Sequence, residues 1–538
     1  MTTMKRIKRL WITASAVILW ALPCFHDLSA LALPTEEAAP RFPINRFIIE
    51  GNSILPADKT VTLLVEFTGK SRDFGDIQQA IERLEKAYRD RGYTMVTVIL
   101  PEQELTGGDV RLKIIEPKVK EIRIEGNRHF DSNNIEATLP TLKKGESPQI
   151  PAISENLRAA NENPAKKITL QFRSDENPEE LQALLQVNDK KPWKITLSAD
   201  NTGSPDTGRY RTGLGLQHFN LFNRDHIAAL QYITSPDHAD SVNTFSGSYR
   251  LPLYKLGDTL DLFGAYSDVK SGTTQISGTN ISISGKGVIS GFRYAKNLPR
   301  HGDYEQKLVA GMDYRLYDNS AVMLNTELAK DVVAHPLSLT YGGSWTTDPL
   351  SMDGSLGILY NIPWGGQGGK SDYRAVRSGA EADYLILRYG LNLLLRPGAD
   401  WMLRIAGAGQ YTPDRLIPGE QLGLGGASMI RGYEEREESW DGGFGGSFEI
   451  YTPDIAGYLK LPDTRLRLLG FFDGGTGYNL RTQSGELRKN SLKSAGAGLR
   501  MTLGEAVSFS FDWGYPLDDS IQTSKGESAV HFSAQISY

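Results

Sequence analysis

The residues with the clearest potential for specific chemistry are Arg431 and Asp473. Apolar and polar residues alternate along the segment 466–475, which predicts a strand that carries Asp473 on its more polar face. Arg431 lies in a long stretch, 412–440, whose glycines allow the backbone to turn back sharply. A guanidinium can hold a carboxylate through two parallel hydrogen bonds, so we predict an ion pair, with Tyr433 packed alongside. The alternative is an exposed arginine that makes no fixed contact.

Other residue types used in catalysis form no arrangement typical of an enzyme. The eight histidines are scattered, and the chain has one cysteine, Cys24. The stretch 423–425 begins like a dinucleotide-binding loop, but Ser428 stands where the third glycine is needed. Four glutamates after Arg431 are most simply interpreted as a loop in contact with water; they are Glu434, Glu435, Glu437 and Glu438. We therefore predict a protein that is not an enzyme, with no catalytic residue, no metal and no cofactor.

The N-terminus predicts export from the cytoplasm. Basic residues precede a short apolar core at 11–22, and Ala30-Leu31-Ala32 matches a small-x-small cleavage motif. We expect residues 1–32 to be a signal peptide that is cleaved between Ala32 and Leu33; an uncleaved membrane anchor is the alternative. No later apolar run reaches about 20 residues, which excludes a helical membrane protein. With 59 basic and 64 acidic residues the chain is not a basic nucleic-acid-binding protein.

Composition changes near residue 192. Two of the 23 tyrosines and eight of the 55 glycines precede residue 193. Downstream, apolar and polar residues alternate in runs such as 507–515 and 530–538, which are long enough for a tilted strand to cross a bilayer. An even number of strands suits a closed antiparallel barrel, which leaves no unpaired edge in lipid; a soluble all-β domain is the alternative. Turn signals divide residues 192–538 into sixteen such segments, with approximate starts at 192, 208, 225, 241, 258, 283, 301, 334, 350, 383, 399, 441, 463, 491, 505 and 528.

Upstream of the predicted barrel, the chain repeats itself. The tetrapeptide Ile-Glu-Gly-Asn occurs at 49–52 and again at 124–127. Each copy ends a short predicted strand and is followed by helical patterning and then by two more strands, so the element order β-α-α-β-β occurs twice. We therefore predict two domains of the same fold, at 42–116 and 117–191, preceded by a short segment, 33–41.

Three motifs resemble those of the two-partner secretion transporters (TpsB), the group that includes the haemolysin secretion/activation proteins ShlB, FhaC and HecB. The segment 92–110 is similar to the family's first POTRA signature. The segment 425–433 is similar to its loop motif, usually written VRGY, with isoleucine in place of valine, and 471–475 is similar to its strand motif F-x-D-x-G. The residues that carry the resemblance are Gly92, Tyr93, Pro101, Gln103 and Gly108; Ile430, Arg431, Gly432 and Tyr433; and Phe471, Asp473 and Gly475.

The resemblance implies a mainly β protein of the outer membrane of a Gram-negative-type cell. Two periplasmic POTRA domains would precede a 16-stranded antiparallel transmembrane barrel, 192–538, whose long loop 412–440 folds into the lumen. The implied function is export of one large exoprotein, a TpsA-like partner with an N-terminal secretion domain, after recognition by the POTRA domains. The other implied partners are outer-membrane lipid and, during biogenesis, the barrel-assembly machinery; nucleic acid is not among them.

The resemblance also assigns a role to the chain end. Phe532, Ile536 and Tyr538 share one face of the last predicted strand and are expected to point to lipid, with the terminal aromatic read by the assembly machinery. Family members often carry a plug helix before the first POTRA domain. About ten residues at 33–42 are too few for a helix that fills a pore, so we expect a less obstructed channel.

Recognition of the exported chain is expected in the first domain, where the helix at 77–88 and the strand at 94–100 would form a groove to which an extended polypeptide adds a strand. The alternative is that these residues are only domain core and surface. Two other functions stay open: a BamA-like factor that inserts other barrels, and a porin-type solute channel. Assembly factors usually have more than two POTRA domains and porins need none, so the domain count favours export.

Overall fold

The computed structural model describes residues 40–538, apart from gaps at 106, 175–176, 205–206, 240–241, 269–271, 277–278, 284–285, 319–321, 324–325 and 328–329. The expected signal peptide with Ala30 and Ala32, and most of the segment 33–41, lie outside the described residues. Contacts divide the chain into two compact units, one up to Leu84 with Val98–Ile114, the other Glu85–Thr97 with Ile115–Tyr538. No described helix has the length and apolarity needed to cross a membrane.

The first repeat contains a three-stranded sheet of order β2-β5-β4, in which β2 and β5 run parallel and β4 is an edge strand. Its longer helix buries Ile77, Ala80 and Leu84, which recur at the spacing of one helix face. A small antiparallel pair, β1 with β3, was not predicted from the sequence. The elements are β1 (Phe42–Ile44), β2 (Arg46–Glu50), α1 (Ala57–Leu64), η1 (Val65–Phe67), β3 (Gly69–Arg72), α2 (Phe74–Arg89), β4 (Thr97–Ile99) and β5 (Asp109–Ile115).

The second repeat has the same strand arrangement, with sheet order β6-β8-β7. The repeated tetrapeptide makes the same turn in both copies: Gly51 and Gly126 have φ of +81° and +86°. A Cβ at either glycine would lie within 2.4 Å of a carbonyl oxygen of the neighbouring strand, so only glycine fits. The elements are β6 (Lys118–Glu125), α3 (Ser132–Ala137), α4 (Ile150–Ala160), β7 (Lys166–Ser174) and β8 (Glu180–Asp189).

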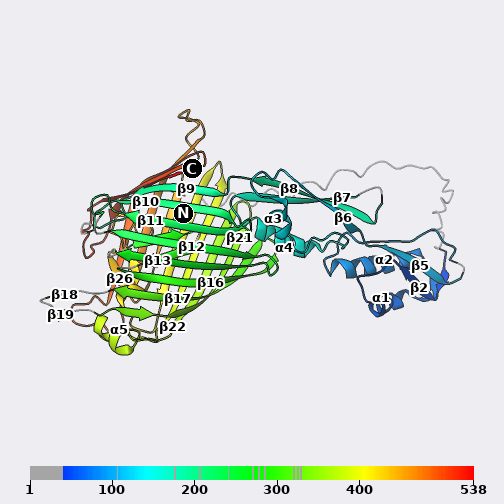
Figure 1. The fold of residues 1–538 in the computed structure, drawn as a ribbon, viewed down its shortest axis with the longest axis horizontal. Helices are drawn as coiled ribbons and strands as arrows, with labels where there is room; N and C mark the ends of the chain where they lie inside the picture. Colours follow the sequence, from blue (N-terminus) through cyan, green and yellow to red (C-terminus); the bar gives the residue numbers. More distant parts are fainter. Residues whose placement is uncertain are drawn as a thin grey trace, which may run out of the picture. The chain divides into compact units, whose positions relative to one another are not determined.

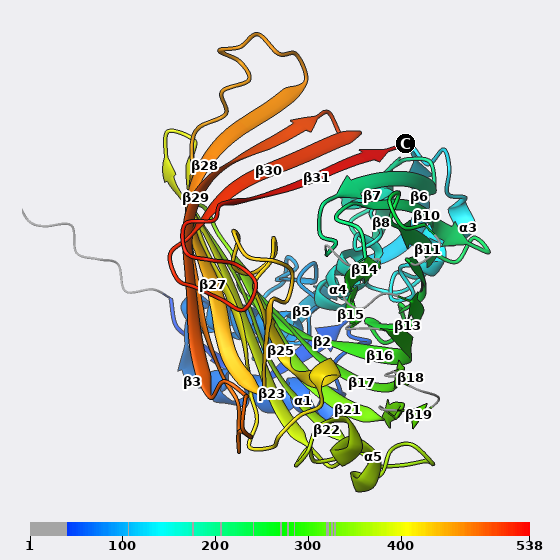
Figure 2. The ribbon, with the colours of Figure 1, turned by 90° about the vertical axis from the view of Figure 1, so that its left-hand side faces the viewer.

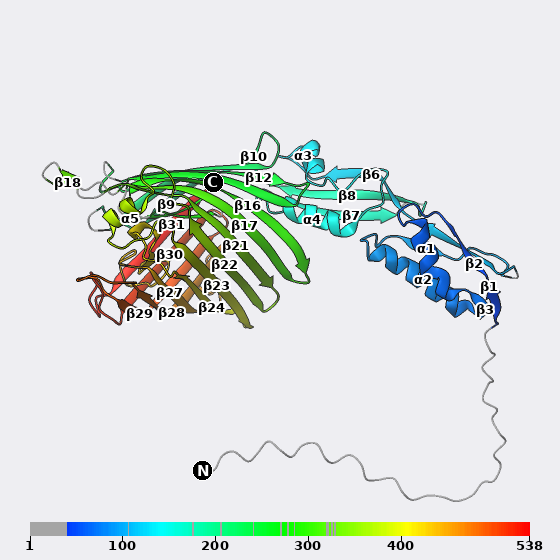
Figure 3. The same ribbon diagram turned by 90° about the horizontal axis from the view of Figure 1, so that it is seen from below.

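The remaining chain forms the closed, antiparallel, sixteen-stranded barrel that the sequence predicts, seen from the side in Figure 1 and from below in Figure 3. Every strand begins within three residues of its predicted start. β20 and β21 are two parts of one strand, interrupted at His335, because both pair with β17. The strands are β9 (Trp193–Asp200), β10 (Arg211–Leu221), β11 (His226–Thr234), β12 (Asn243–Leu253), β13 (Asp258–Asp268), β16 (Lys286–His301), β17 (Tyr304–Asp318), β20 (Val332–Ala334) with β21 (Pro336–Thr346), β22 (Leu350–Asn361), β23 (Leu385–Gly398), β24 (Trp401–Tyr411), β27 (Gly442–Tyr451), β28 (Thr464–Tyr478), β29 (Lys489–Leu503), β30 (Val507–Pro516) and β31 (Ala529–Ser537).

Smaller elements lie in the connections between barrel strands. They are the hairpins β14 (Gly272–Ile276) with β15 (Thr279–Ile283) and β18 (Val322–Met323) with β19 (Thr326–Glu327), the helix α5 (Lys370–Val376), and η2 (Pro418–Glu420), β25 (Leu422–Leu424) and β26 (Glu438–Trp440) between β24 and β27. Large apolar side chains such as Leu230, Phe245 and Leu356 are exposed on the outer face of the barrel, where lipid would cover them.

The barrel closes at the seam between β9 and β31. Figure 2 shows β30 and β31 side by side, with the C-terminus at the end of β31. Five Cα pairs, from Ser533 with Asp200 to Ser537 with Thr196, hold the seam, and the side-chain amide of Asn201 bonds the backbone of β31 beyond them.

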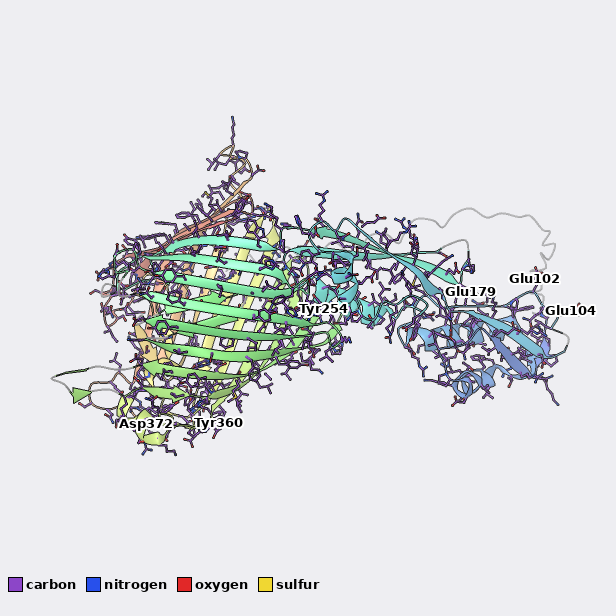
Figure 4. All side chains as sticks on the ribbon, in the orientation of Figure 1. Glu102, Glu104, Glu179, Tyr254, Tyr360 and Asp372 are labelled. Atoms are coloured by element: carbon purple, nitrogen blue, oxygen red, sulfur yellow. The ribbon has the colours of Figure 1, made fainter. Side chains whose placement is uncertain are left out.

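The second repeat is bonded to the first periplasmic turn of the barrel. Buried Lys166 on β7 forms an ion pair with buried Asp225 in that turn, and Asn134 of α3 donates to the same aspartate at 2.9 Å. Tyr254, labelled in Figure 4, donates its hydroxyl proton to Asp225, and its carbonyl accepts from Asn156 of α4. These buried polar groups satisfy one another, so repeat and barrel are joined by specific contacts.

Candidate functional site in the barrel lumen

The connection between β24 and β27, residues 412–441, folds back into the barrel; we call it the lumenal loop. It begins with η2, continues as the short hairpin β25–β26, and reaches farthest into the lumen at its tip, 425–435. This loop was expected to enter the lumen. Its short hairpin, whose strands have three residues each, was not predicted from the sequence.

At the tip, Arg431 holds the carboxylate of Asp473 with two parallel hydrogen bonds. Nε lies 2.8 Å from Oδ2 and Nη2 lies 2.7 Å from Oδ1, and the main-chain N–H of Arg431 also donates to Oδ2, at 3.0 Å. The guanidinium stacks on the ring of Phe471, with Cζ 3.5 Å from its centroid. Asp473 is fully buried and Arg431 is 4% exposed. Loss of Arg431 would therefore leave the buried charge of Asp473 unpaired.

This ion pair belongs to a cluster in which charges balance. Nη1 of Arg431 lies 2.9 Å from Glu449 and 3.5 Å from Asp512. On the wall, Arg404 binds Glu449 at 3.0 Å and Arg500 binds Asp512 at 2.8 Å. With Asp473 included, three guanidiniums face three carboxylates, and only Arg431 comes from the loop. Nowhere in the described chain do three His, Cys, Asp or Glu side chains form a group suited to a metal ion.

The backbone next to Arg431 packs directly on the last two strands. The N–H of Gly432 donates to Nε2 of His531 on β31 at 2.9 Å. Gly432 has φ of +93°, and a Cβ added at Gly514 on β30 would lie 2.6 Å from its nitrogen. Neither glycine leaves room for a side chain, so the glycine in the loop motif is required by this close approach.

Two other motif residues pack into an apolar cluster. Ile430 and Tyr433 are fully buried with Leu424, Trp440 and Leu492. The hydroxyl of Tyr433 lies 2.9 Å from the carbonyl oxygens of Lys493 and Asp518. Tyr433 was expected beside the ion pair, but its side chain lies in this apolar cluster instead. The ring of Phe471 covers the guanidinium of Arg431. A Cβ at Gly475 would lie 2.9 Å from Ile430, which explains the glycine that ends the strand motif.

The expectation that the four glutamates form a loop in contact with water is wrong for two of them. Glu437 is 7% exposed and accepts bonds from the backbone N–H groups of Gln522 and Thr523, at 2.9 and 2.7 Å. Glu438 is 1% exposed and accepts from Asn490 at 2.7 Å. Their partners come from distant loops, so charge clustering along the chain could not reveal them. Glu434 and Glu435 are half-buried.

A second attachment, at the base of the loop, was not predicted from the sequence. Buried Glu420 receives Nη1 of Arg315 at 2.8 Å on each oxygen and the hydroxyl of Tyr317 at 2.7 Å. Burial opposes ionisation, but the guanidiniums of Arg315 and Arg388 hold the pKa of the Glu420 carboxyl below its usual value. No motif marks this glutamate, and Arg315 lies on the far β17, so no local signal could have found the pair.

Apolar packing surrounds that second attachment. Leu416 and Ile417 of the loop are buried against Tyr373, Tyr384 and other side chains of β20, β22, β23 and the α5 segment. The main-chain N–H of Leu416 also donates to Asp441 at the loop's other end, at 3.0 Å. The base of the loop is therefore a small core of its own.

The POTRA signature residues serve backbone geometry. Gly92 has φ of +88°, and a Cβ there would lie 2.8 Å from Pro151. Gly108 has φ of +75°, and its carbonyl accepts from Asn45 at 2.6 Å. Gln103 bonds both backbone groups of Arg111 on β5, at 2.8 and 2.7 Å, as a neighbouring strand would. Tyr93 donates its backbone N–H to the carbonyl of Tyr88 at 3.0 Å, and the carbonyl of Pro101 accepts from the side-chain amide of Gln103 at 3.3 Å.

The chain end lies at the foot of the seam. The backbone of Tyr538 pairs with Ile195 in both directions, at 2.8 and 2.9 Å. Ile536 and Tyr538 are 55% and 77% exposed on the outer face, whereas Phe532 is half-buried beside the ring of Tyr210.

Comparison with known proteins agrees with this architecture. Residues 182–501 match the family of haemolysin secretion/activation proteins ShlB/FhaC/HecB, and residues 42–117 match the ShlB-type POTRA domain. The chain is 23% identical over 511 residues to the heme/hemopexin transporter protein HuxB of Haemophilus influenzae, covering 89% of this chain and 85% of that protein. It is 25% identical over 501 residues to the outer membrane transporter CdiB of Escherichia coli, covering 89% and 79%.

Two solved structures have the same fold as this chain. CdiB from Escherichia coli superposes with a TM-score of 0.73 at 19% identity, covering 94% of this chain and 92% of that one. CdiB from Acinetobacter baumannii gives 0.66 at 17% identity, covering 96% and 93%. Because the first family match spans more than half of the chain, the protein belongs to the ShlB/FhaC/HecB family of outer-membrane transporters, a family that is not a class of enzymes.

Proposed function

We propose that this protein exports one large polypeptide from the periplasm through its barrel to the cell surface. The observation that carries the proposal is the joining of two POTRA-like repeats to a closed barrel whose lumenal loop is held at its tip by balanced ion pairs. A porin has no use for the repeats, and a loop whose tip is held largely by ion pairs and hydrogen bonds suits a channel that must open for a polypeptide. Members of the family such as CdiB and HuxB are named as transporters.

The domain assignment that supports this function is a signal peptide, 1–32, a short segment, 33–41, POTRA domains at 42–116 and 117–191, and the barrel at 192–538 with its lumenal loop. The signal residues Ala30 and Ala32 would be removed on export. The Phe532, Ile536 and Tyr538 face would be read by the barrel-assembly machinery and then covered by lipid.

Recognition of the partner is assigned to the first repeat. β4 is an edge strand whose Thr97 and Ile99 are exposed on either side of buried Val98, and Phe74 at the start of α2 is 52% exposed. An extended segment of a TpsA-like exoprotein, in its N-terminal secretion domain, would pair with β4 through main-chain bonds and place side chains against α2.

Proteomics of a deletion strain tests this proposal. We expect loss of one very large protein from the cell surface and medium, restored by the wild-type gene. General depletion of other barrels would instead support an assembly factor. No lost protein but altered uptake of small solutes would support a porin. To test recognition, Ile99→Pro removes a main-chain N–H from β4. This variant should block export while the amount of folded barrel stays normal, whereas Ile99→Val should leave export unchanged.

A further inference from the structure

The tip of the lumenal loop divides the space inside the barrel into two cavities. One, of about 630 Å³, lies between the tip and the wall formed by β9, β10, β11, β30 and β31; we call it the corridor. The other, of about 660 Å³, lies against β22, β23, β24 and β27; we call it the pouch. Ala427 and Ser428 of the tip line both, so the tip is the partition between them.

The corridor follows β9 along its whole length. It is lined by alternate residues of that strand, from Lys194 near its periplasmic start through Thr196 and Ser198 to Asp200 at its outer end, and by Thr202 beyond. None of these side chains is buried. Among the described residues, therefore, the corridor borders the lumenal face of β9 from one end of the strand to the other.

The pouch ends halfway along its strands. Asp353 and Ser355 of β22 line it, but the next residues on the same face, Leu359 and Asn361, are 5% and 0% exposed. What covers them is the base of the lumenal loop, with its apolar cluster and the Glu420 ion pair. The outer end of the pouch is therefore closed by packed side chains.

At its periplasmic end the corridor adjoins a third cavity, at the foot of the seam. That cavity, of about 660 Å³, shares Lys194 and Gln217 with the corridor and shares no residue with the pouch. Its walls include Trp193 and Phe219 of the barrel and Pro164 of the second repeat. A polypeptide that leaves the second repeat here would meet the corridor first.

We propose that the exported polypeptide crosses the barrel in extended form along the corridor, against the lumenal faces of β9 and β10, and that the pouch takes no part. This rests on the proposed export function, but the choice of side does not depend on which protein is exported. The lining suits an unfolded chain of mixed sequence, because it offers short hydroxyl side chains and charges of both signs: Thr196, Ser198, Ser510, Ser533, Lys194 and Asp200.

Cysteine labelling of the full-length protein tests the proposal in planar bilayers. The only cysteine, Cys24, lies in the expected signal peptide, so introduced thiols would be unique. Ser198→Cys and Ser533→Cys place a thiol in the corridor, and Ser355→Cys is the matched control in the pouch. A bulky thiol reagent on either corridor variant should lower ion conductance at least about twofold, whereas the same adduct in the pouch should change it little. Mass spectrometry of the labelled protein checks that each introduced thiol carries the adduct.

An equal or larger effect at Ser355→Cys would overturn the proposal, as would unchanged conductance in all three labelled variants, or failure of both corridor thiols to react. A second measurement concerns the polypeptide itself. In cells, the same adducts should stop appearance of the large surface protein for the corridor variants only. If the deletion strain loses no exported protein, the export function fails, while the conductance result still decides which side of the tip is the open path.

Discussion

The tip and the base of the lumenal loop are both fixed to the barrel wall, but by different physical means. At the tip, one arginine meets three carboxylates in a charge-balanced cluster next to two water-accessible cavities. At the base, the Glu420 ion pair is surrounded by a packed apolar cluster. Polar contacts can exchange with water, whereas apolar packing must be pulled apart. The tip also has apolar packing, at Ile430 and Tyr433, but its apolar cluster is smaller than the one at the base, so the base is the firmer attachment.

The strongest test of this difference removes the tip contact. We predict that Arg431→Ala and Asp473→Ala each abolish or strongly reduce export of the partner while the barrel still inserts. Arg431→Ala leaves Asp473 buried without its counter-charge, and Asp473→Ala removes the two parallel bonds that orient the guanidinium. The double variant should be little worse than either single one, since the two residues act as a pair. Export is measured by immunoblot of the surface protein, with Arg209→Ala, which removes an exposed arginine, as control. Normal export by both single variants would refute a functional role for the pair.

Next in size is the effect expected at the base. Glu420→Gln should destabilise the folded barrel by on the order of 1–3 kcal/mol, because it weakens the buried charge-assisted hydrogen bonds from Arg315 and Tyr317, while Asp313 still pairs with Arg315 at 2.7 Å. Glu434→Gln, at a largely exposed ion pair with Arg209, should cost about 0–1 kcal/mol. The measurement is the temperature at which the folded band disappears in heat-modifiable gel migration. If the two variants unfold at the same temperature, the base is not the firmer attachment.

A third test separates assembly from function. Deletion of Tyr538 removes the backbone pair with Ile195 and the exposed terminal aromatic at the foot of the seam. We expect less folded barrel in the outer membrane, but normal export per folded molecule, because loop contacts at tip and base are unchanged. Quantifying folded protein and exported partner in the same cells checks this. Wild-type levels of folded barrel in the deletion would remove the assembly role.

The smallest expected effect is a dependence on pH. Burial raises the pKa of Glu435, at the tip, to about 7, and this residue lines the corridor. The carboxyl is neutral below that pKa and charged above it, so cation selectivity of the channel should rise between about pH 6 and pH 8. Reversal potentials in a salt gradient measure this. Glu435→Gln should be flat over the same range; an unchanged slope in that variant would assign the effect to another group.

Much of the fold could be predicted from the sequence because two-residue alternation directly reports a strand with one lipid face. That is why all sixteen strand starts lie within three residues of expectation. The repeated Ile-Glu-Gly-Asn likewise encodes a left-handed glycine that both repeats need. The pairing of Arg431 with Asp473 was expected because both residues lie in motifs that resemble those of the family, and because strand parity and the glycine-rich loop allow both side chains to point into the lumen.

The remaining features depend on long-range contacts that carry no local pattern. Glu420 meets Arg315 across the barrel, and Glu437 meets a turn near the chain end, at Thr523. The position of Tyr433 was misjudged because neighbours in sequence point in different directions once the tip turns. The positions of the corridor and the pouch depend on where the base of the loop packs against the barrel wall. That packing can be seen only in the folded protein.

The side chain of Gln103 limits the part of the first repeat's sheet to which a second copy of the chain could pair. Its side-chain amide occupies both hydrogen-bonding groups of Arg111 on β5, so part of that strand's edge is already closed by the chain itself. What stays available on this side of the sheet is β4, only three residues long. A short free edge offers too few main-chain bonds for two copies to join into a continuous sheet, whereas a partner with well-matched side chains can still bind. On this side of its sheet, the first repeat therefore offers little to a second copy, while the short β4 would serve the proposed recognition of a partner.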